Sequence, residues 1–342
     1  MAALKKRVLL GMSGGVDSTA AAIVLKDAGY EVLGVYMKMH DDEEFHRTNF
    51  EKASRVAESL GIEILFHDIS DRFTSEVYDY FVDEYIDGRT PNPCIVCNRK
   101  IKFGEMVDFA DTLGIEMVAT GHYARSEDGR IRVAADREKD QSYFLAMLKR
   151  EVLPRLLFPV GDMKKEEVRA LTKNIELFRD IAEQKESQEI CFVEDSYIDV
   201  LSRHMEVDRE GEVVDRDGNV IGIHRGYMHY TVGKRRGFTV RGAHDPHYVL
   251  SLDADTNRIV VGKRDELAVD RIELEGVNLL GEFGGGRCGV KARYRMPAVE
   301  ARVEIDGDRA AITLEEPVYG VARGQYGVFY DGDTLLGGGV IV

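Results

Sequence analysis

The first 120 residues alternate between short apolar runs and longer segments that carry one apolar face. The short apolar runs are typical of buried strands and lie at residues 7–12, 32–37, 62–66 and 115–119. Between them, apolar residues recur three and four positions apart, as a helix requires, for example at Ala21, Val24, Leu25 and Ala28. Gly29 and Gly61 follow the first two helical segments, where helices commonly end. This alternation predicts an α/β fold with a doubly wound parallel sheet.

The pattern changes after about residue 200. Residues 208–242 are rich in Gly, Arg, His and Tyr, with a turn signal at Asp217-Gly218. From about residue 257, alternating apolar and polar runs flank Asp306-Gly307 and Asp331-Gly332, which predicts hairpins of a small antiparallel β-barrel. The chain is therefore expected to hold an α/β domain (1–198), a small connector domain (199–262) and a C-terminal β-barrel domain (263–342).

Composition narrows the class of protein. No apolar run approaches the roughly 18 residues that cross a membrane, and the short basic N-terminus has no cleavage site. We therefore expect no membrane partner and a cytoplasmic location. Four cysteines in 342 residues are too few for a disulfide framework, and a Cys-x-x-Cys pair in a reducing compartment points to metal binding or redox chemistry. The net charge of −15 argues against nucleic-acid binding unless the basic residues cluster.

Ser13-Gly14-Gly15-Val16-Asp17-Ser18 lies between the first predicted strand and the first predicted helix. Two glycines let the backbone approach a phosphate closely, and the helix supplies unpaired N–H groups and the positive end of its dipole. The serine hydroxyls add hydrogen bonds, and Asp17 is a candidate magnesium ligand. The loop is neither a Walker A loop nor a GxGxxG loop. A plain glycine-rich turn is the alternative, and the strand–turn–helix context favours phosphate binding.

Cys94 and Cys97 follow Pro91 and Pro93 and precede a predicted helix. We expect the prolines to prevent helix formation before residues 97–98, which places both thiols at or near a helix N-terminus. The helix dipole and nearby basic side chains lower a thiol pKa at such a position. A structural zinc site is the alternative, and Cys288 is predicted on the apolar side of a strand. Cys191, between Ile and Phe, has the surroundings of a core residue.

These motifs belong to a longer resemblance. The nucleotide loop resembles the PP-loop of the N-type ATP pyrophosphatases, which split ATP between the α- and β-phosphates to adenylate a carbonyl. Beyond the loop, nearly the whole chain resembles tRNA-specific 2-thiouridylase, and segments of that family occur here in the same order. They are GMSGGVDS (11–18), GRTPNPCIVCNRKIKF (88–103), ATGHYAR (119–125), KDQSYFL (139–145), SQEICF (187–192), YTVGKRRGF (230–238) and ARYR (292–295).

The resemblance implies a fold, a reaction and a set of site residues. The fold is the PP-loop, adenine nucleotide alpha hydrolase-like sheet, followed by a connector and a barrel that both contact tRNA. ATP, with Mg²⁺, adenylates the C2 carbonyl of a wobble uridine, and a cysteine persulfide supplies the sulfur that replaces the oxygen. Cys97 is the implied nucleophile, Cys191 the persulfide carrier and Asp17 a further catalytic residue. The partners are tRNA and a sulfur donor protein, either a cysteine desulfurase or a sulfur relay protein.

Binding residues follow from the same matching. ATP would contact Gly11, Met12, Ser13, Gly14, Gly15, Val16, Asp17, Ser18, Met37 and Gly121. The target base would lie against Asn92, Pro93 and Cys94. The tRNA would contact Lys139, Asp140, Gln141, Arg293 and Tyr294. Simpler interpretations remain for some of these residues, with Met37 in the core and Lys139 and Asp140 as a solvated surface pair.

Cys94 departs from the family pattern, because many members carry Asp there. A thiol is a weak substitute for a carboxylate that acts as an acid or base. Cys94, Cys97 and Cys191 therefore offer an alternative route, an iron–sulfur cluster with one open iron; apart from it and from the Mg²⁺ that accompanies ATP, no metal site is expected. Two other functions compete: a PP-loop ligase that adenylates a small metabolite, and a redox-sensing RNA-binding protein. An acidic loop is expected around residues 41–44, and this loop between Met37 and Phe50, which has no cysteine, also departs from the family.

Basic residues do cluster, despite the negative net charge. One group lies in the predicted connector: Arg225, Lys234, Arg235, Arg236 and Arg241. A second group follows from strand alternation over residues 287–295, which places Arg287, Lys291, Arg293 and Arg295 on one face. Both groups are candidate phosphate contacts, and ordinary surface charge is the alternative.

Overall fold

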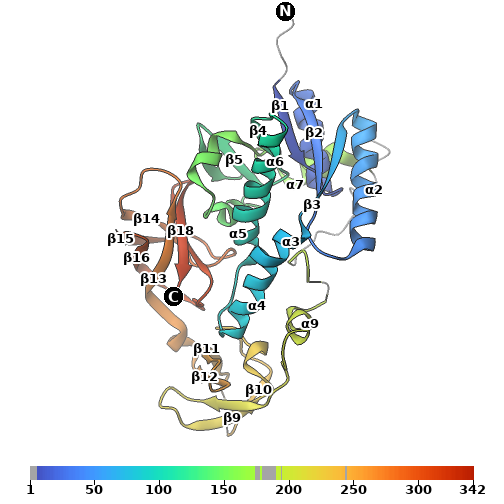
Figure 1. The fold of residues 1–342 in the computed structure, drawn as a ribbon. Helices are drawn as coiled ribbons and strands as arrows, with labels where there is room; N and C mark the ends of the chain where they lie inside the picture. The colour runs from blue at the N-terminus through green and yellow to red at the C-terminus, as the bar shows by residue number, and fades with distance from the viewer. Residues whose placement is uncertain (1–5, 174–177, 179–189, 194, 243–244) are drawn as a thin grey trace, which may run out of the picture. The chain divides into compact units, whose positions relative to one another are not determined.

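A computed structural model describes residues 6–173, 178, 190–193, 195–242 and 245–342 (Figure 1). The chain divides into two compact units. The first unit comprises residues 1–76, 94–188 and 333–335, and the second comprises residues 77–93, 189–332 and 336–342. Elements whose residues fall in both units are η1 (Thr74–Tyr78), α5 (Pro93–Cys97) and β18 (Thr334–Ile341).

The first unit is built on a parallel sheet with the strand order β3-β2-β1-β4-β7. Its strands are β1 (Arg7–Gly11), β2 (Glu31–Lys38), β3 (Glu63–Asp68), β4 (Met117–Ala119) and β7 (Leu156–Leu157), with a hairpin of β5 (Ala124–Glu127) and β6 (Arg130–Val133). Its helices are α1 (Val16–Asp27), α2 (Glu43–Leu60), α3 (Ser70–Phe73), η2 (Asn98–Glu105), α6 (Met106–Thr112), η3 (Ser142–Leu145), η4 (Arg150–Arg155) and α7 (Lys165–Lys173).

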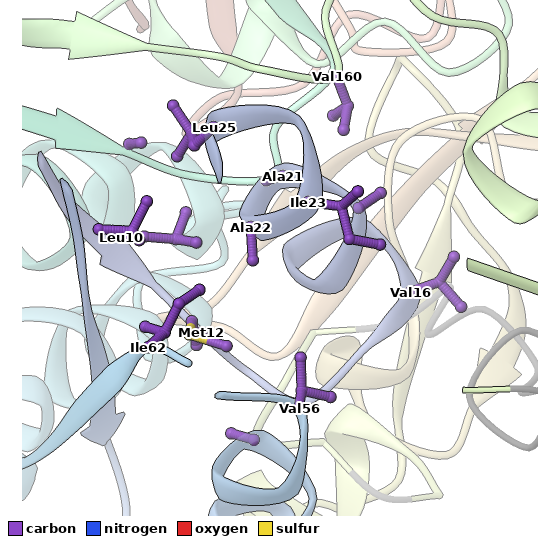
Figure 2. Close-up of a cluster of buried hydrophobic side chains, with 14 of the residues drawn as sticks. Leu10, Met12, Val16, Ala21, Ala22, Ile23, Leu25, Val56, Ile62 and Val160 are labelled. Atoms are coloured by element: carbon purple, nitrogen blue, oxygen red, sulfur yellow. The ribbon is translucent and has the colours of Figure 1, made fainter. Parts of the chain in front are cut away.

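Helices cover both faces of this sheet because β1 alternates two apolar faces. Val8 and Leu10 belong to a buried cluster with side chains of α1 and α2, part of which Figure 2 shows. The next positions along β1 face the other way: a Cβ on Gly11 would lie 3.3 Å from Met106 Sδ of α6. Full burial of each leucine in such a cluster stabilises the fold by roughly 1.5–3 kcal/mol. The predicted doubly wound parallel sheet is confirmed.

The predicted elements of this unit agree closely with the structure. The four predicted strands are present, with ends shifted by up to two residues. Gly61 ends α2 in the left-handed conformation, with φ of 61°. The acidic segment 41–44 was expected to be a loop. This expectation is wrong for Glu43 and Glu44, because α2 begins at Glu43. Asp42 caps that helix, its Oδ1 accepting a hydrogen bond from the Phe45 N–H at 2.9 Å, and acidic residues favour a helix N-terminus.

The second unit contains two β structures. One sheet has the strand order β10-β9-β8-β12-β11 and consists of β8 (Gly211–Val214), β9 (Val220–His224), β10 (Phe238–Val240), β11 (Tyr248–Asp253) and β12 (Arg258–Gly262). The other is a barrel of β13 (Ala268–Leu279), β16 (Arg309–Tyr319), β15 (Val299–Asp306), β14 (Gly286–Lys291), β17 (Tyr326–Asp331) and β18, closed by pairing of β13 with β18. Its helices include α4 (Asp79–Ile86), η6 (Tyr227–His229), η7 (Arg264–Leu267) and α9 (Tyr197–Ser202).

The turn signals of this region are confirmed, and two expectations are corrected. Asp217-Gly218 joins β8 to β9, Asp306-Gly307 joins β15 to β16, and Asp331-Gly332 joins β17 to β18. The β structure begins at Gly211, earlier than the expected position near residue 257. The strand expected over 287–295 ends at Lys291, because the chain turns there. Within the described residues, no helix is long and apolar enough to span a membrane.

Candidate active site

The loop between β1 and α1 has the geometry of a phosphate-binding turn. Gly14 adopts φ of +78°, and a Cβ there would lie 3.0 Å from the Asn49 carbonyl oxygen, so glycine is required. Helix α1 begins at Val16, and no side chain caps it at Gly15. The first N–H groups of the helix therefore have no capping side chain, which suits an anion. The Ser13 and Ser18 hydroxyls lie 3.3 Å apart beside the turn.

Asp17, in the first turn of α1, is held by two residues that the sequence did not single out. The Tyr123 hydroxyl donates a hydrogen bond to Asp17 Oδ1 at 2.8 Å. Lys165 Nζ, from the start of α7, lies 2.7 Å from Oδ1 and 2.9 Å from Oδ2. Tyr123 falls inside the ATGHYAR segment, which was the available signal, whereas nothing in the sequence around Lys165 pointed to the loop.

Gly121 packs directly against the start of α1. A Cβ at this position would lie 2.7 Å from the Asp17 carbonyl carbon and 2.9 Å from the Ser18 nitrogen. Only glycine lets the strand end approach the helix this closely. Met37 is half-buried near the end of β2, where it is paired with His67 of β3. Met37 lies near the end of β2 and Gly121 just after the end of β4, and nucleotides bind at the ends of parallel strands in such folds.

The cysteine helix starts earlier than expected. Helix α5 begins at Pro93, since a proline is tolerated in the first helical turn, and the expectation that helix is prevented until 97–98 is wrong. Cys94 is half-buried and Cys97 is buried at the end of α5. Burial raises the pKa of the Cys94 thiol, and the charge of Lys102 acts in the opposite, weaker direction. For Cys94, the expected lowering of the thiol pKa is therefore corrected.

The residues directly after Cys97 tie it to a second segment of the first unit. Asn98 Nδ2 donates a hydrogen bond to the Phe144 carbonyl at 3.1 Å. Arg99 Nη1 donates to the Met147 carbonyl at 3.0 Å. The segment 139–147 thus lies against the helix that carries Cys97.

The same segment includes three of the residues matched to tRNA contacts. Lys139 is half-buried, whereas Asp140 is only 5% exposed. Asp140 accepts hydrogen bonds from the Ala134 N–H at 3.0 Å and from the Ser142 hydroxyl at 2.8 Å. Asp140 is therefore not a solvated surface residue. Gln141 Oε1 accepts a hydrogen bond from the Tyr123 N–H at 2.9 Å.

The approach to the cysteine helix is anchored within the second unit. The Thr90 N–H donates to the Arg323 carbonyl at 2.8 Å, and Gln325 Nε2 donates to the Thr90 carbonyl at 2.9 Å. The next residues, Asn92 and Pro93, are buried. The segment between β16 and β17 therefore holds the chain at Thr90.

Cys191 also belongs to the second unit, and its surroundings differ from those expected of a core residue. Its neighbours Ile190 and Phe192 are partly buried against an apolar cluster that includes Phe81 and Val193. Cys191 itself is exposed. A thiol held at the surface by two anchored neighbours is accessible to a macromolecular partner. Ser187, Gln188 and Glu189 of the same motif lie outside the described residues.

The remaining cysteine has a structural role. Cys288 is buried in the barrel core, as expected, and burial raises its pKa to about 12. Among the described residues, no group of three or more His, Cys, Asp or Glu side chains is placed to hold a metal ion.

The two basic groups differ. Between Asp217 and Asp245 the chain carries five Arg and Lys and no acidic residue. Arg235 and Arg236 are exposed, and within the described part of the chain neither forms a salt bridge. Lys234 is instead turned inward, with Nζ 2.6 Å from the His229 carbonyl.

The barrel group is dispersed. Arg287 pairs with Glu315, and Lys291 lies over the Tyr330 ring at 5.8 Å. Because the strand ends at Lys291, Arg293 and Arg295 do not continue its face, and the expected row of four cations is wrong. Arg293 Nη2 donates to the Val232 carbonyl at 3.1 Å, and Tyr294 is half-buried.

Comparison with known proteins extends over the whole chain. Residues 6–195 match the family described as tRNA methyl transferase HUP domain, residues 198–263 a tRNA methyl transferase PRC-barrel domain, and residues 269–341 an aminomethyltransferase beta-barrel domain. The chain is 53% identical over 339 residues to a tRNA-specific 2-thiouridylase MnmA from Nitratiruptor sp., covering 99% of this chain and 100% of the relative. It is 51% identical to the protein of that name from Sulfurimonas denitrificans, covering 99% of each.

Solved structures are more distant. NMN synthetase from Francisella tularensis is 15% identical with a TM-score of 0.36, covering 54% of this chain and 67% of that one.

Proposed function

Because the chain belongs to the tRNA-specific 2-thiouridylase family, we propose that Cys191 carries the sulfur of its reaction as a persulfide and that Cys97 is the nucleophile that releases it. The enzyme is a tRNA-uridine 2-sulfurtransferase, which adenylates the C2 carbonyl of a tRNA uridine with ATP and replaces the oxygen by sulfur. Neither the small-metabolite ligase nor the iron–sulfur route is favoured by these relatives. The target that we propose is the wobble uridine.

The first step uses the nucleotide loop. The uridine O2 attacks the α-phosphorus of ATP, the bond to the β-phosphate breaks, and pyrophosphate leaves. The adenylated oxygen is then a good leaving group. The uncapped start of α1 and the backbone of Gly14 and Gly15 support this assignment, because they present N–H groups to the departing phosphates.

The second step uses both thiols. The terminal sulfur of a Cys191 persulfide attacks C2, and the C2–O bond breaks with release of AMP. The Cys97 thiolate then attacks Sγ of Cys191, which breaks the S–S bond, leaves sulfur on C2 and forms a Cys97–Cys191 disulfide. The two thiols supply the two electrons that reduce the transferred sulfur, and a thiol reductant restores them. The burial of Cys97 and the exposure of Cys191 support this division, because the carrier must meet its donor.

Asp17 has the chemistry of a Mg²⁺ ligand. Its carboxylate stands beside the loop, half-exposed and held in one orientation, and carboxylate oxygens are ligands that Mg²⁺ prefers. When bound, Mg²⁺ would neutralise charge on the phosphates. Asp17 also places the ammonium group of Lys165 beside the start of α1, and the Tyr123 hydroxyl fixes the Asp17 carboxylate by a hydrogen bond.

We propose further that the three sequence segments divide the work. Residues 1–198 bind ATP and carry Cys97 and Cys191, whereas the connector (199–262) and the barrel (263–342) bind tRNA. The exposed Arg235 and Arg236 support the connector's part. The proposed sulfur donor is a cysteine desulfurase or a relay protein, and a cytoplasmic location fits these partners.

The observation that carries the proposal is that Cys97 and the nucleotide loop lie in one compact unit. Pyrophosphate release from ATP, measured with and without unmodified tRNA, tests it. We expect release that depends on tRNA, because the uridine is the acceptor. Equal release without tRNA would indicate the ligase, and no release under any condition would indicate a redox-sensing RNA-binding protein.

A further inference from the structure

The nucleotide loop is connected to the segment 139–147 by an unbroken chain of hydrogen bonds. Gln141 and Tyr123 are joined twice: the Tyr123 N–H donates to Gln141 Oε1 at 2.9 Å, and the Gln141 N–H donates to the Tyr123 carbonyl at 2.7 Å. The Tyr123 hydroxyl donates in turn to Asp17 Oδ1 at 2.8 Å. A displacement of Gln141 therefore moves the residue that orients Asp17.

Asp17 is sensitive to such a movement because the Tyr123 hydroxyl and the charged Lys165 together set the direction of its carboxylate. Lys165 Nζ bonds both carboxylate oxygens and lies 5.3 Å from the centre of the Tyr123 ring. The Lys165 side chain is 12% exposed, and its N–H donates to Asp136 Oδ2 at 2.9 Å, so the lysine is fixed at the start of α7. Charge-assisted hydrogen bonds of this kind are the stronger ones and set the carboxylate's direction.

The segment around Gln141 is rigid. Asp140 is buried and accepts hydrogen bonds on both sides, from Ala134 and from Ser142. The following residues 142–145 include three that are fully buried: Ser142, Tyr143 and Leu145. Close-packed segments transmit a displacement instead of absorbing it.

The other end of the segment reaches η2, which follows Cys97 directly, through the bonds from Asn98 to Phe144 and from Arg99 to Met147. One closely packed segment thus contacts both the residues that orient the nucleotide loop and the helical turn that follows Cys97. Lys139, half-buried at its start, belongs to the part matched to tRNA.

We propose that Tyr123 is a positioning residue that couples tRNA contact at Lys139–Gln141 to the orientation of Asp17 in the nucleotide loop. This inference rests on the proposed function, because it needs tRNA at residues 139–141 and ATP at the loop. Contact of tRNA with residues 139–141 shifts Gln141, and Tyr123 passes this shift to Asp17, which then takes the orientation that adenylation requires. ATP is then consumed only in the presence of the acceptor.

The test compares Tyr123→Phe and Gln141→Ala with the wild type. Tyr123→Phe removes only the hydroxyl that bonds Asp17, and Gln141→Ala removes the acceptor that holds Tyr123. The matched control is Tyr30→Phe, which makes the same change in the same unit. Tyr30 lies directly before β2, at the starting ends of the parallel strands, whereas the loop follows the end of β1. Pyrophosphate release is measured with and without tRNA, together with tRNA affinity by filter binding, dependence on Mg²⁺ and melting temperature.

Both variants should lose about tenfold in the ratio of release with tRNA to release without it, the effect of about one charge-assisted hydrogen bond. Tyr123→Phe should also need more Mg²⁺ for half-maximal release and should bind tRNA as the wild type does. Tyr30→Phe should match the wild type throughout.

An unchanged ratio in Tyr123→Phe beside a stimulated wild type overturns this inference alone. The same holds if Tyr123→Phe lowers release equally with and without tRNA, because Tyr123 would then act on the loop without coupling. A wild type that tRNA does not stimulate overturns the proposed function, and this inference with it.

Discussion

At the scale of single residues, the site depends on close approach and on burial. Gly121 lies so near the start of α1 that any side chain would collide with the backbone of Asp17 and Ser18. Cys94 shows the second effect, because burial raises its pKa although it lies in the first turn of a helix. A protonated Cys94 thiol does not supply the negative charge of the aspartate that the family resemblance implies at this position. Cys97 and Cys191 therefore remain the proposed pair for sulfur transfer.

Gly121→Ala should lower ATP affinity at least tenfold and destabilise the first unit by about 1–3 kcal/mol, since the methyl group overpacks a site with no room. Isothermal titration with a non-hydrolysable ATP analogue and thermal unfolding measure the two effects. Gly281→Ala is the control, because a Cβ there meets nothing within 4 Å. Wild-type affinity in Gly121→Ala would refute the close approach.

The contacts of single residues were the part of the site that the sequence did not predict. Asp17 was recognised from its loop, but its partners Tyr123 and Lys165 lie 106 and 148 positions away, and no local pattern connects them. Asp140, between Lys139 and Gln141, has the sequence context of a surface residue. It is buried because the N–H groups of Ala134 and Ser142 satisfy its carboxylate, and such turn contacts leave no periodic pattern in the sequence.

At the scale of elements, the local sequence pattern predicted the structure better than it predicted the contacts of single residues. The period of apolar residues predicted the parallel strands, and Asp-Gly pairs predicted the barrel hairpins and the turn between β8 and β9. Element ends were the weak point. Pro93 starts α5 and Glu43 starts α2, because a helix N-terminus accepts proline and acidic residues that resemble loop signals.

The contact between α2 and β2 should make the first unit sensitive to acid. His46 of α2 bonds the Tyr36 hydroxyl of β2 through Nδ1 at 2.8 Å, and its Nε2 accepts the His40 N–H at 3.3 Å. Burial lowers the pKa of His46 from 6.5 to about 4. Protonation of Nε2 would break the bond from His40, so the folded state resists taking up the proton.

Between pH 6.5 and about pH 4 the unfolded state therefore binds the proton more strongly than the folded state, and the free energy of unfolding falls as the pH falls. Chemical denaturation at several pH values in this range gives the free energy of unfolding as a function of pH. Its slope should be steeper in the wild type than in His46→Gln, by at most about 1.4 kcal/mol per pH unit. Equal slopes in the two proteins would show that His46 titrates normally.

At the scale of the whole molecule, charge is unevenly distributed. The net charge is −15, yet the stretch between Asp217 and Asp245 carries five basic residues and no acidic ones. Sequence alone identified this group by its spacing along the chain, and Arg235 and Arg236 within it are exposed. It overestimated how many cations the barrel strand aligns on one face, because a strand over residues 287–295 was expected and the chain turns after Lys291. The connector is therefore the better candidate for phosphate contacts.

Arg235→Ala/Arg236→Ala should weaken tRNA binding about tenfold or more and reduce the dependence of log affinity on log salt by about 1.4–1.8, as for two lost phosphate contacts. Filter binding over a range of KCl concentrations measures both. The control Lys26→Ala/Arg47→Ala removes two exposed charges from α1 and α2. If the control and the test variant have the same salt dependence, the connector does not bind phosphates.

The central claim is that Cys97 and Cys191 together put sulfur on a tRNA uridine activated by ATP. Mass spectrometry of nucleosides from unmodified tRNA, incubated with enzyme, ATP, Mg²⁺, cysteine and a cysteine desulfurase, tests it most directly. We predict 2-thiouridine with the wild type and with Cys288→Ser, whose thiol is buried in the barrel, and none with Cys97→Ser or Cys191→Ser. Formation of 2-thiouridine by either of the last two variants would contradict the account.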